Sequence, residues 1–107
     1  MTDKRIVLTT VGNAEEAEKI ATALVERRLA ACVNISGPID SVYRWKGAVE
    51  RAQEWLLIVK TTAEMAAAAG DAITELHSYE VPECIVLPVE SGSDAYLAWI
   101  GENVSGE

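Results

Sequence analysis

Residues 30–60 of the chain read AACVNISGPIDSVYRWKGAVERAQEWLLIVK, two strand-like arms joined by a short turn. From Ala31 to Ile35, apolar residues alternate with small or polar ones, a pattern typical of a β-strand. The alternation is interrupted at Gly37-Pro38, which we interpret as a bulge or bend, because too few residues precede it to complete a hairpin. The stretch therefore predicts one long antiparallel hairpin.

Lys46-Gly47 is the candidate two-residue turn of this hairpin. Such a turn places Trp45 opposite Ala48, Tyr43 opposite Glu50 and Val42 opposite Arg51. Each arm of about 15 residues would extend roughly 50 Å, whereas a domain of this size is only about 35 Å across. A straight hairpin would therefore overhang its own domain, and its exposed aromatic residues would need a partner subunit. Alternatively, Pro38 folds the arm back onto its own domain.

The segments on either side of the hairpin predict helices and further strands. Residues 5–11 form a β-branched run that favours a strand buried on both faces. Asn13 is placed to cap a helix, with Glu16 at capping-box distance and a single apolar stripe behind it. Thr61 and Glu64 suggest the same arrangement for a second helix. We expect a last strand at residues 84–88, with Pro88 at a sheet edge, and a short terminal helix at about residues 94–103 that buries Tyr96, Leu97 and Ile100.

The order strand-helix-strand, strand-helix-strand is the split β-α-β arrangement of ferredoxin-like folds, in the α+β class. Right-handed crossovers place both main helices on one face of a four-stranded antiparallel sheet. The sequence therefore predicts a single ferredoxin-like domain over residues 1–107, with a long hairpin between the second and third strands and a short C-terminal helix.

Composition narrows the range of partners. The 107 residues are 50% hydrophobic and 24% charged, with a formal net charge of −8. This is ordinary globular composition and excludes intrinsic disorder, while the acidic balance argues against nucleic acid and anionic membranes. An acidic surface is compatible with cations, or it simply keeps the protein soluble. Without a signal peptide or an apolar run long enough for a membrane span, we expect a cytoplasmic protein.

Chemically active side chains gather in residues 77–83, HSYEVPE, between the second helix and the last strand. His77, Tyr79 and two carboxylates share this one loop, although each could equally be a capping, packing or solvated residue. Lys60 ends an apolar strand, where it either extends to solvent or closes a cleft. Cys32 is expected at the opposite sheet edge from Cys84, so an intrachain disulfide is not expected.

Five motifs in order make the chain similar to a known family. They are Ala30-Ala31-Cys32-Val33-Asn34, Ser41-Val42-Tyr43-Arg44-Trp45-Lys46-Gly47, Val59-Lys60-Thr61-Thr62, Leu76-His77-Ser78-Tyr79-Glu80-Val81-Pro82-Glu83 and Tyr96-Leu97-Ala98-Trp99-Ile100. With these motifs the chain resembles the CutA family of divalent-cation tolerance proteins over essentially its whole length.

The resemblance implies a homotrimer of small cytosolic subunits whose long hairpins wrap their neighbours. It also implies a role in tolerance of copper and other divalent metals. Metal binding in the family is attributed to cysteine and histidine side chains, and His77 and Cys32 match these positions. The chain departs from the family at Thr9, where some members have a cysteine, and at Ser78, where the family usually has proline.

Three functions are compatible with these residues. The first is a non-enzymatic trimeric protein that binds Cu or Zn weakly through His77, Cys32 and Glu83, with no organic cofactor. The second, by analogy with signalling trimers of the PII type, is a sensor that holds an anionic ligand in inter-subunit clefts. Its cleft would be lined by Tyr43, Trp45, Lys60 and Tyr79. The third is an isomerase-like enzyme in which His77, Tyr79 and Glu83 move protons, but no nucleophile or cofactor site supports it.

Overall fold

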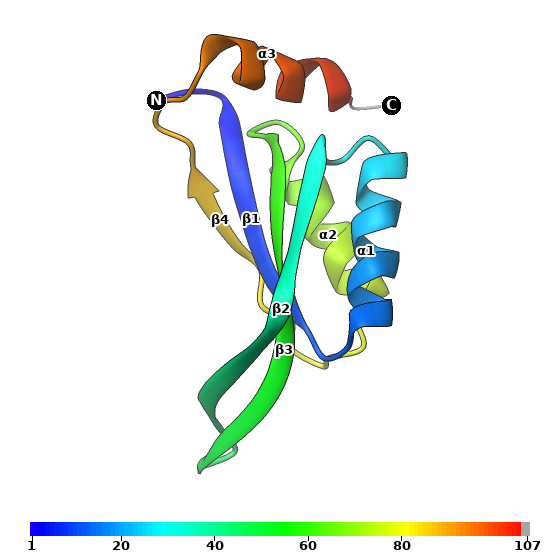
Figure 1. The fold of residues 1–107 in the computed structure, drawn as a ribbon, viewed down its shortest axis with the longest axis vertical. Helices are drawn as coiled ribbons and strands as arrows, with labels where there is room; N and C mark the ends of the chain where they lie inside the picture. Colours follow the sequence, from blue (N-terminus) through cyan, green and yellow to red (C-terminus); the bar gives the residue numbers. More distant parts are fainter. Residues whose placement is uncertain (106–107) are drawn as a thin grey trace.

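The computed structural model describes residues 1–105 and contains one four-stranded antiparallel sheet and three helices (Figure 1). The strands lie in the order β2-β3-β1-β4. The elements are β1 (Lys4–Val11), α1 (Ala14–Glu26), β2 (Cys32–Trp45), β3 (Ala48–Thr62), α2 (Ala66–Leu76), β4 (Ile85–Pro88) and α3 (Asp94–Asn103). The predicted α+β, ferredoxin-like architecture is confirmed.

Both long helices cover the same face of the sheet, as predicted, and the core lies between the two layers (Figure 1). On the sheet side, Val7, Leu57 and Val59 are fully buried. On the helix side, Ile20 and Ile73 are fully buried. Because β-strand side chains alternate between faces, Ile6, Leu8 and Thr10 of β1 point away from the helices and are only half-buried. The prediction that this strand is buried on both faces is thus correct for one face only within a single chain.

The hairpin of β2 and β3 extends well beyond the helices (Figure 1). Its turn is at Lys46-Gly47, where both residues have positive φ values of 50° and 83°, and the predicted pairing of Trp45 with Ala48 is observed. The register shifts between Ser36 and Ile39, which confirms the predicted bulge. The molecule measures 44 Å along its longest axis against 25 and 21 Å along the others. The strands therefore stay extended past the bulge instead of doubling back along themselves.

The sequence predicted the N-terminal cap of α1 correctly but that of α2 wrongly. Asn13 caps α1 by accepting a 2.8 Å hydrogen bond from the backbone N–H of Glu16. Thr61, predicted to cap the second helix, is instead a buried residue of β3 whose hydroxyl donates to the carbonyl of Leu29 at 2.7 Å. The helix begins five residues later, because Thr62 and the following residues form a turn first.

Helix α3 lies across the end of the sheet opposite the hairpin tip (Figure 1). Ile100 is buried there as expected, but Tyr96 is 42% exposed, so the prediction that it is buried is wrong. The Tyr96 side chain instead stacks beside Trp99 and accepts a 3.3 Å hydrogen bond from the Lys60 ammonium. None of the helices in the described residues has the length and hydropathy required to cross a membrane.

Candidate functional site

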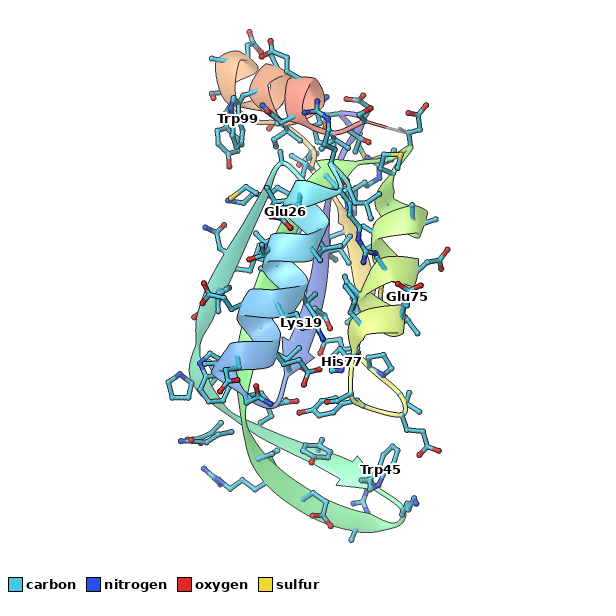
Figure 2. The ribbon with its side chains drawn as sticks, turned by 90° about the vertical axis from the view of Figure 1, so that its right-hand side faces the viewer. Lys19, Glu26, Trp45, Glu75, His77 and Trp99 are labelled. Carbon is cyan, nitrogen blue, oxygen red and sulfur yellow. The ribbon has the colours of Figure 1, made fainter. Side chains whose placement is uncertain are left out.

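A groove of about 590 Å³ lies between the hairpin and the loop that follows α2. Its walls come from three segments that are distant in sequence: β1, the two arms of the hairpin, and the loop. The lining residues are Thr10, Ser41, Val42, Tyr43, Trp45, Glu54, Tyr79, Glu80, Val81, Pro82 and Glu83. Figure 2 shows His77 and Trp45 toward this same end of the molecule, with Trp99 at the other.

A hydrogen bond between Tyr79 and Glu54 connects the loop to the hairpin. The Tyr79 hydroxyl donates to the Glu54 carboxylate at 2.8 Å, and Glu54 is only 8% exposed. Burial, followed by the neighbouring Glu54 carboxylate, raises the pKa of Tyr79 well above its ordinary value. The tyrosine therefore stays a neutral hydrogen-bond donor at physiological pH.

His77 lies behind this groove, with its side chain fully buried. Its Nδ1 accepts a 3.1 Å hydrogen bond from the backbone N–H of Tyr79. The other nitrogen, Nε2, lies 2.7 Å from the carbonyl oxygen of Thr10. A carbonyl can only accept, so Nε2 carries the proton and the ring is the neutral Nε2–H tautomer. Both nitrogens are occupied, so a metal could bind only if the ring gave up one of these partners.

Glu16 holds the start of the same loop. Its carboxylate accepts 2.8 Å hydrogen bonds from both the backbone N–H and the hydroxyl of Ser78. One of its oxygens also lies 3.4 Å from Nδ1 of His77. Glu16 was expected to complete the capping box of α1, but its side chain connects α1 to the loop after α2 instead. The backbone N–H and the hydroxyl of Ser78 make this connection.

The structure brings four of the predicted site residues into the groove, keeps His77 in contact with one of them, and separates Lys60 and Cys32 from them. Tyr43, Trp45, Tyr79 and Glu83 line the groove. Lys60 does not join them, because its ammonium is hydrogen-bonded to Tyr96 near α3.

The two predicted soft ligands lie at different ends of the sheet. Cys32 pairs with Lys60 across the hairpin strands, toward the α3 end, and its thiol contacts Asn34 at 3.9 Å. His77 instead contacts Thr10, near the end of β1 that faces the hairpin tip. A single chain therefore does not bring Cys32 and His77 together.

The charges around the groove favour a cation over an anion. Glu54, Glu80 and Glu83 all line it, and no Lys, Arg or unpaired His side chain does so among the described residues. The described part of the chain nevertheless contains no group of three His, Cys, Asp or Glu side chains positioned to hold a metal ion.

Sequence reasoning did not identify Glu54 or Glu16 as members of this site. A signal for Glu54 was available, because strand alternation places it on the same face as Leu56 and Ile58, where a charged residue is unexpected. No local pattern pointed to Glu16, whose partner Ser78 is 62 residues away.

A large apolar surface continues from the groove across the sheet face that the two long helices leave uncovered. It includes Ile6, Leu8, Leu56 and Ile58, all half-buried in the single chain. The edge strand β4 extends it with Ile85 and Leu87, which are 48% and 42% exposed. Contiguous apolar surface of this kind marks sites where proteins associate.

Comparison with known proteins identifies one family. The family model described as CutA1 divalent ion tolerance protein matches residues 5–103. The divalent-cation tolerance protein CutA of Thermus thermophilus is 48% identical over 100 residues, covering 94% of this chain and 97% of that protein. Protein CutA of Homo sapiens is 46% identical over 91 residues, which cover 85% of this chain but 51% of the human protein. The chain thus spans about half the length of the human relative, and 52% of the chloroplastic CutA of Arabidopsis thaliana.

Solved structures lead to the same family. The crystal structure of CutA from Xylella fastidiosa superposes with a TM-score of 0.95 at 38% identity, covering 97% of this chain and 100% of that one. The periplasmic divalent cation tolerance protein CutA of Archaeoglobus fulgidus gives a TM-score of 0.92 at 42% identity, covering 95% and 99% of the two chains.

Proposed function

Because the chain belongs to the CutA1 family of divalent-ion tolerance proteins, we propose that it is a non-enzymatic, metal-responsive homotrimer of the cytoplasm that binds copper or zinc weakly. The proposal that the protein binds a metal rests on the negative charge of the groove. Three carboxylates line it without a basic counter-charge among the described residues.

Two surfaces support assembly. The uncovered sheet face is apolar, and the hairpin carries Tyr43 and Trp45 beyond the domain with 43% and 42% of their surface exposed. A ring of three copies would cover both surfaces and protect the exposed edge of β4.

The proposed metal ligands are Glu83 in the groove, His77 behind it and Cys32 of a neighbouring subunit, because one chain does not bring Cys32 and His77 together. A thiolate with an imidazole favours Cu or Zn over Mg or Ca. Affinity is modest, because His77 must first exchange one of its two hydrogen bonds for the metal. Both cysteines are free thiols, so the thiol of Cys32 is available as a ligand.

The alternative of a PII-like sensor for an anionic ligand has less support. Its cleft needs a positive charge, and Lys60 is placed with Tyr96 near α3 instead.

Calorimetric titration with Cu(II) and Zn(II) tests the proposal. We expect binding at about pH 7.5 that weakens at about pH 5.5, because protons compete with the metal for imidazole. Binding should be weakened by His77→Ala and Cys32→Ser. Cys84→Ser, which changes the other cysteine, is the matched control and should bind as the wild type does. Equal binding by all four proteins at both pH values would exclude His77 and Cys32 as ligands.

A further inference from the structure

We infer that the copies assemble head to tail through the uncovered sheet face, so that Lys60 of one copy pairs with Glu54 of the next. The inference rests on the proposed function, because it requires that the chain forms a homotrimer. It goes beyond that proposal by naming the two residues that meet and the direction in which the copies follow one another around the ring.

Glu54 lies at the hairpin end of this face. Alternation along β3 places it on the same face as Leu56 and Ile58, and only 8% of its surface is exposed. Its carboxylate accepts a hydrogen bond from the neutral hydroxyl of Tyr79, but no cation of the described residues pairs with it. A buried carboxylate without a counter-ion is costly, so Glu54 gains from a positive charge supplied by another copy.

Lys60 lies at the other end of the same face. It is half-buried and pairs with Ile6 of β1, whose side chain also points away from the two long helices. Its ammonium contacts the hydroxyl of Tyr96 at 3.3 Å, and within residues 1–105 no carboxylate forms an ion pair with it. The extended strand β3 holds Lys60 about 20 Å from Glu54, so the two charges cannot pair within one chain.

These charges make the two ends of the face complementary. The hairpin end is acidic, since Glu54, Glu80 and Glu83 line the groove there, whereas the end beside α3 carries Lys60 (Figure 1). Copies that meet with unlike ends together neutralise both charges, whereas copies that meet with two hairpin ends together oppose carboxylate to carboxylate. A contact between unlike ends is heterologous, and such contacts close into a ring when the rotation between copies allows it.

The same direction of assembly supplies the thiol of the proposed metal site. Cys32 is the direct cross-strand partner of Lys60, so it lies at the same end of the face. When Lys60 reaches the groove of the next copy, Cys32 approaches His77 and Glu83 of that copy. Each chain then gives its thiol to one neighbour and receives a thiol from the other.

Opposite charge reversals in two chains test the pair. Glu54→Lys and Lys60→Glu chains, one of them labelled with nitrogen-15, are refolded together, and native mass spectrometry in the presence of EDTA measures the composition of the trimers. Unmixed trimers of either variant have like charges at every contact, whereas mixed trimers keep like charges at a single contact. We expect the ratio of mixed to unmixed trimers to exceed that of random assortment about tenfold, because like charges placed together at an interface are strongly unfavourable.

Glu64→Lys replaces Glu54→Lys in the matched control, because Glu64 is an exposed acid in the turn before α2. When it is mixed with Lys60→Glu, the chains should assort randomly, since each Lys60→Glu chain then adds the same cost to any trimer. Random assortment in both mixtures would overturn the inference and leave the trimer itself standing. A wild-type protein that is not a trimer would instead overturn the proposed assembly, and this inference with it.

Neutral variants provide the test if a charge-reversed chain does not fold. Glu54→Gln and Lys60→Gln should each raise the concentration at which the trimer half-dissociates by about tenfold, measured by analytical ultracentrifugation in urea. The double variant should dissociate no more easily than either single variant, because both changes remove the same contact. Effects that add in the double variant would overturn the inference.

Discussion

The hydroxyl of Tyr79 donates a 2.8 Å hydrogen bond to the carboxylate of Glu54 and so joins the loop after α2 to strand β3. The same tyrosine ring lies against the imidazole of His77, with 4.6 Å between ring centroids. This contact between a phenol and a buried acid thus holds the loop wall of the groove against its hairpin wall.

Replacing Tyr79 by Phe should lower the free energy of unfolding by about 1.5–3 kcal/mol near neutral pH, because the buried carboxylate loses its donor. Urea denaturation measures this change. A stability equal to that of the wild type would mean that water replaces the hydroxyl without cost.

The same contact predicts a pH dependence. The pKa of Tyr79 is raised in the folded protein, mainly by burial and then by Glu54, whereas the unfolded chain releases this proton near pH 10. The stability that comes from this difference in the pKa of Tyr79 is fully present below about pH 10 and is lost as the pH rises above it. The free energy of unfolding then falls by at most about 1.4 kcal/mol per pH unit. When the free energy of unfolding is measured by urea denaturation at several pH values between about 9 and 12, it should fall less steeply with pH for Tyr79→Phe than for the wild type. Parallel curves would contradict the raised pKa.

Two buried threonines form a matched pair. Thr9 and Thr61 are both fully buried on the helix-facing side of the sheet. The hydroxyl of Thr61 donates to Leu29, while that of Thr9 has no hydrogen-bond partner in the described structure. Thr9→Val should therefore raise stability by about 1 kcal/mol, whereas Thr61→Val should lower it by about 1–2 kcal/mol. Changes of the same sign in both variants would show that hydrogen bonding is not the difference.

The sequence predicted the features that depend on neighbouring residues and missed those that depend on distant partners. Alternation and turn chemistry predicted the strands, the Lys46-Gly47 turn and the pairing of Trp45 with Ala48, because these depend on neighbouring residues. The start of α2 was mispredicted, because Thr61 has a good capping sequence but finds its partner in Leu29, 32 residues away.

The sequence likewise predicted some residues of the candidate site and missed others. The loop of His77 and Tyr79 and the aromatic residues of the hairpin were identified because their side-chain chemistry is visible in the sequence. Glu54 was not, because its role depends on a partner 25 residues away. The separation of Cys32 from His77 likewise follows from strand register and not from any local pattern.

Trp45 is expected to anchor the assembly. Trp45→Ala should weaken association by about 2 kcal/mol or more, because a large aromatic residue at an interface loses its contacts. Light scattering at several concentrations measures the shift toward smaller species. Val49→Ala, on the other arm of the hairpin at a residue 65% exposed, is the control and should change association less. Unchanged assembly of Trp45→Ala would remove this residue from the proposed interface.

Adding a methyl group at two glycines, Gly37 in the bulge and Gly101 in α3, should change stability in opposite directions. A Cβ at Gly37 would lie 2.7 Å from Cδ1 of Trp55 and 3.1 Å from its backbone Cα. Gly37→Ala should therefore destabilise the fold by about 1–3 kcal/mol. Gly101→Ala in α3 has room, with its nearest neighbour at 3.4 Å, and should stabilise the helix by up to about 1 kcal/mol. Thermal unfolding compares the two, and an unaffected Gly37→Ala would mean that Trp55 moves aside freely.

We propose that three subunits together bind the metal, because the described residues of one chain contain no group of three His, Cys, Asp or Glu side chains that could hold it. Native mass spectrometry of the protein purified without chelator, before and after addition of Cu(II) or Zn(II), tests this most directly. We predict a trimer that retains metal, and metal-free protein when the trimer is dissociated into single chains. A stable monomer, or a trimer that takes up no metal when either ion is in excess, would contradict the account.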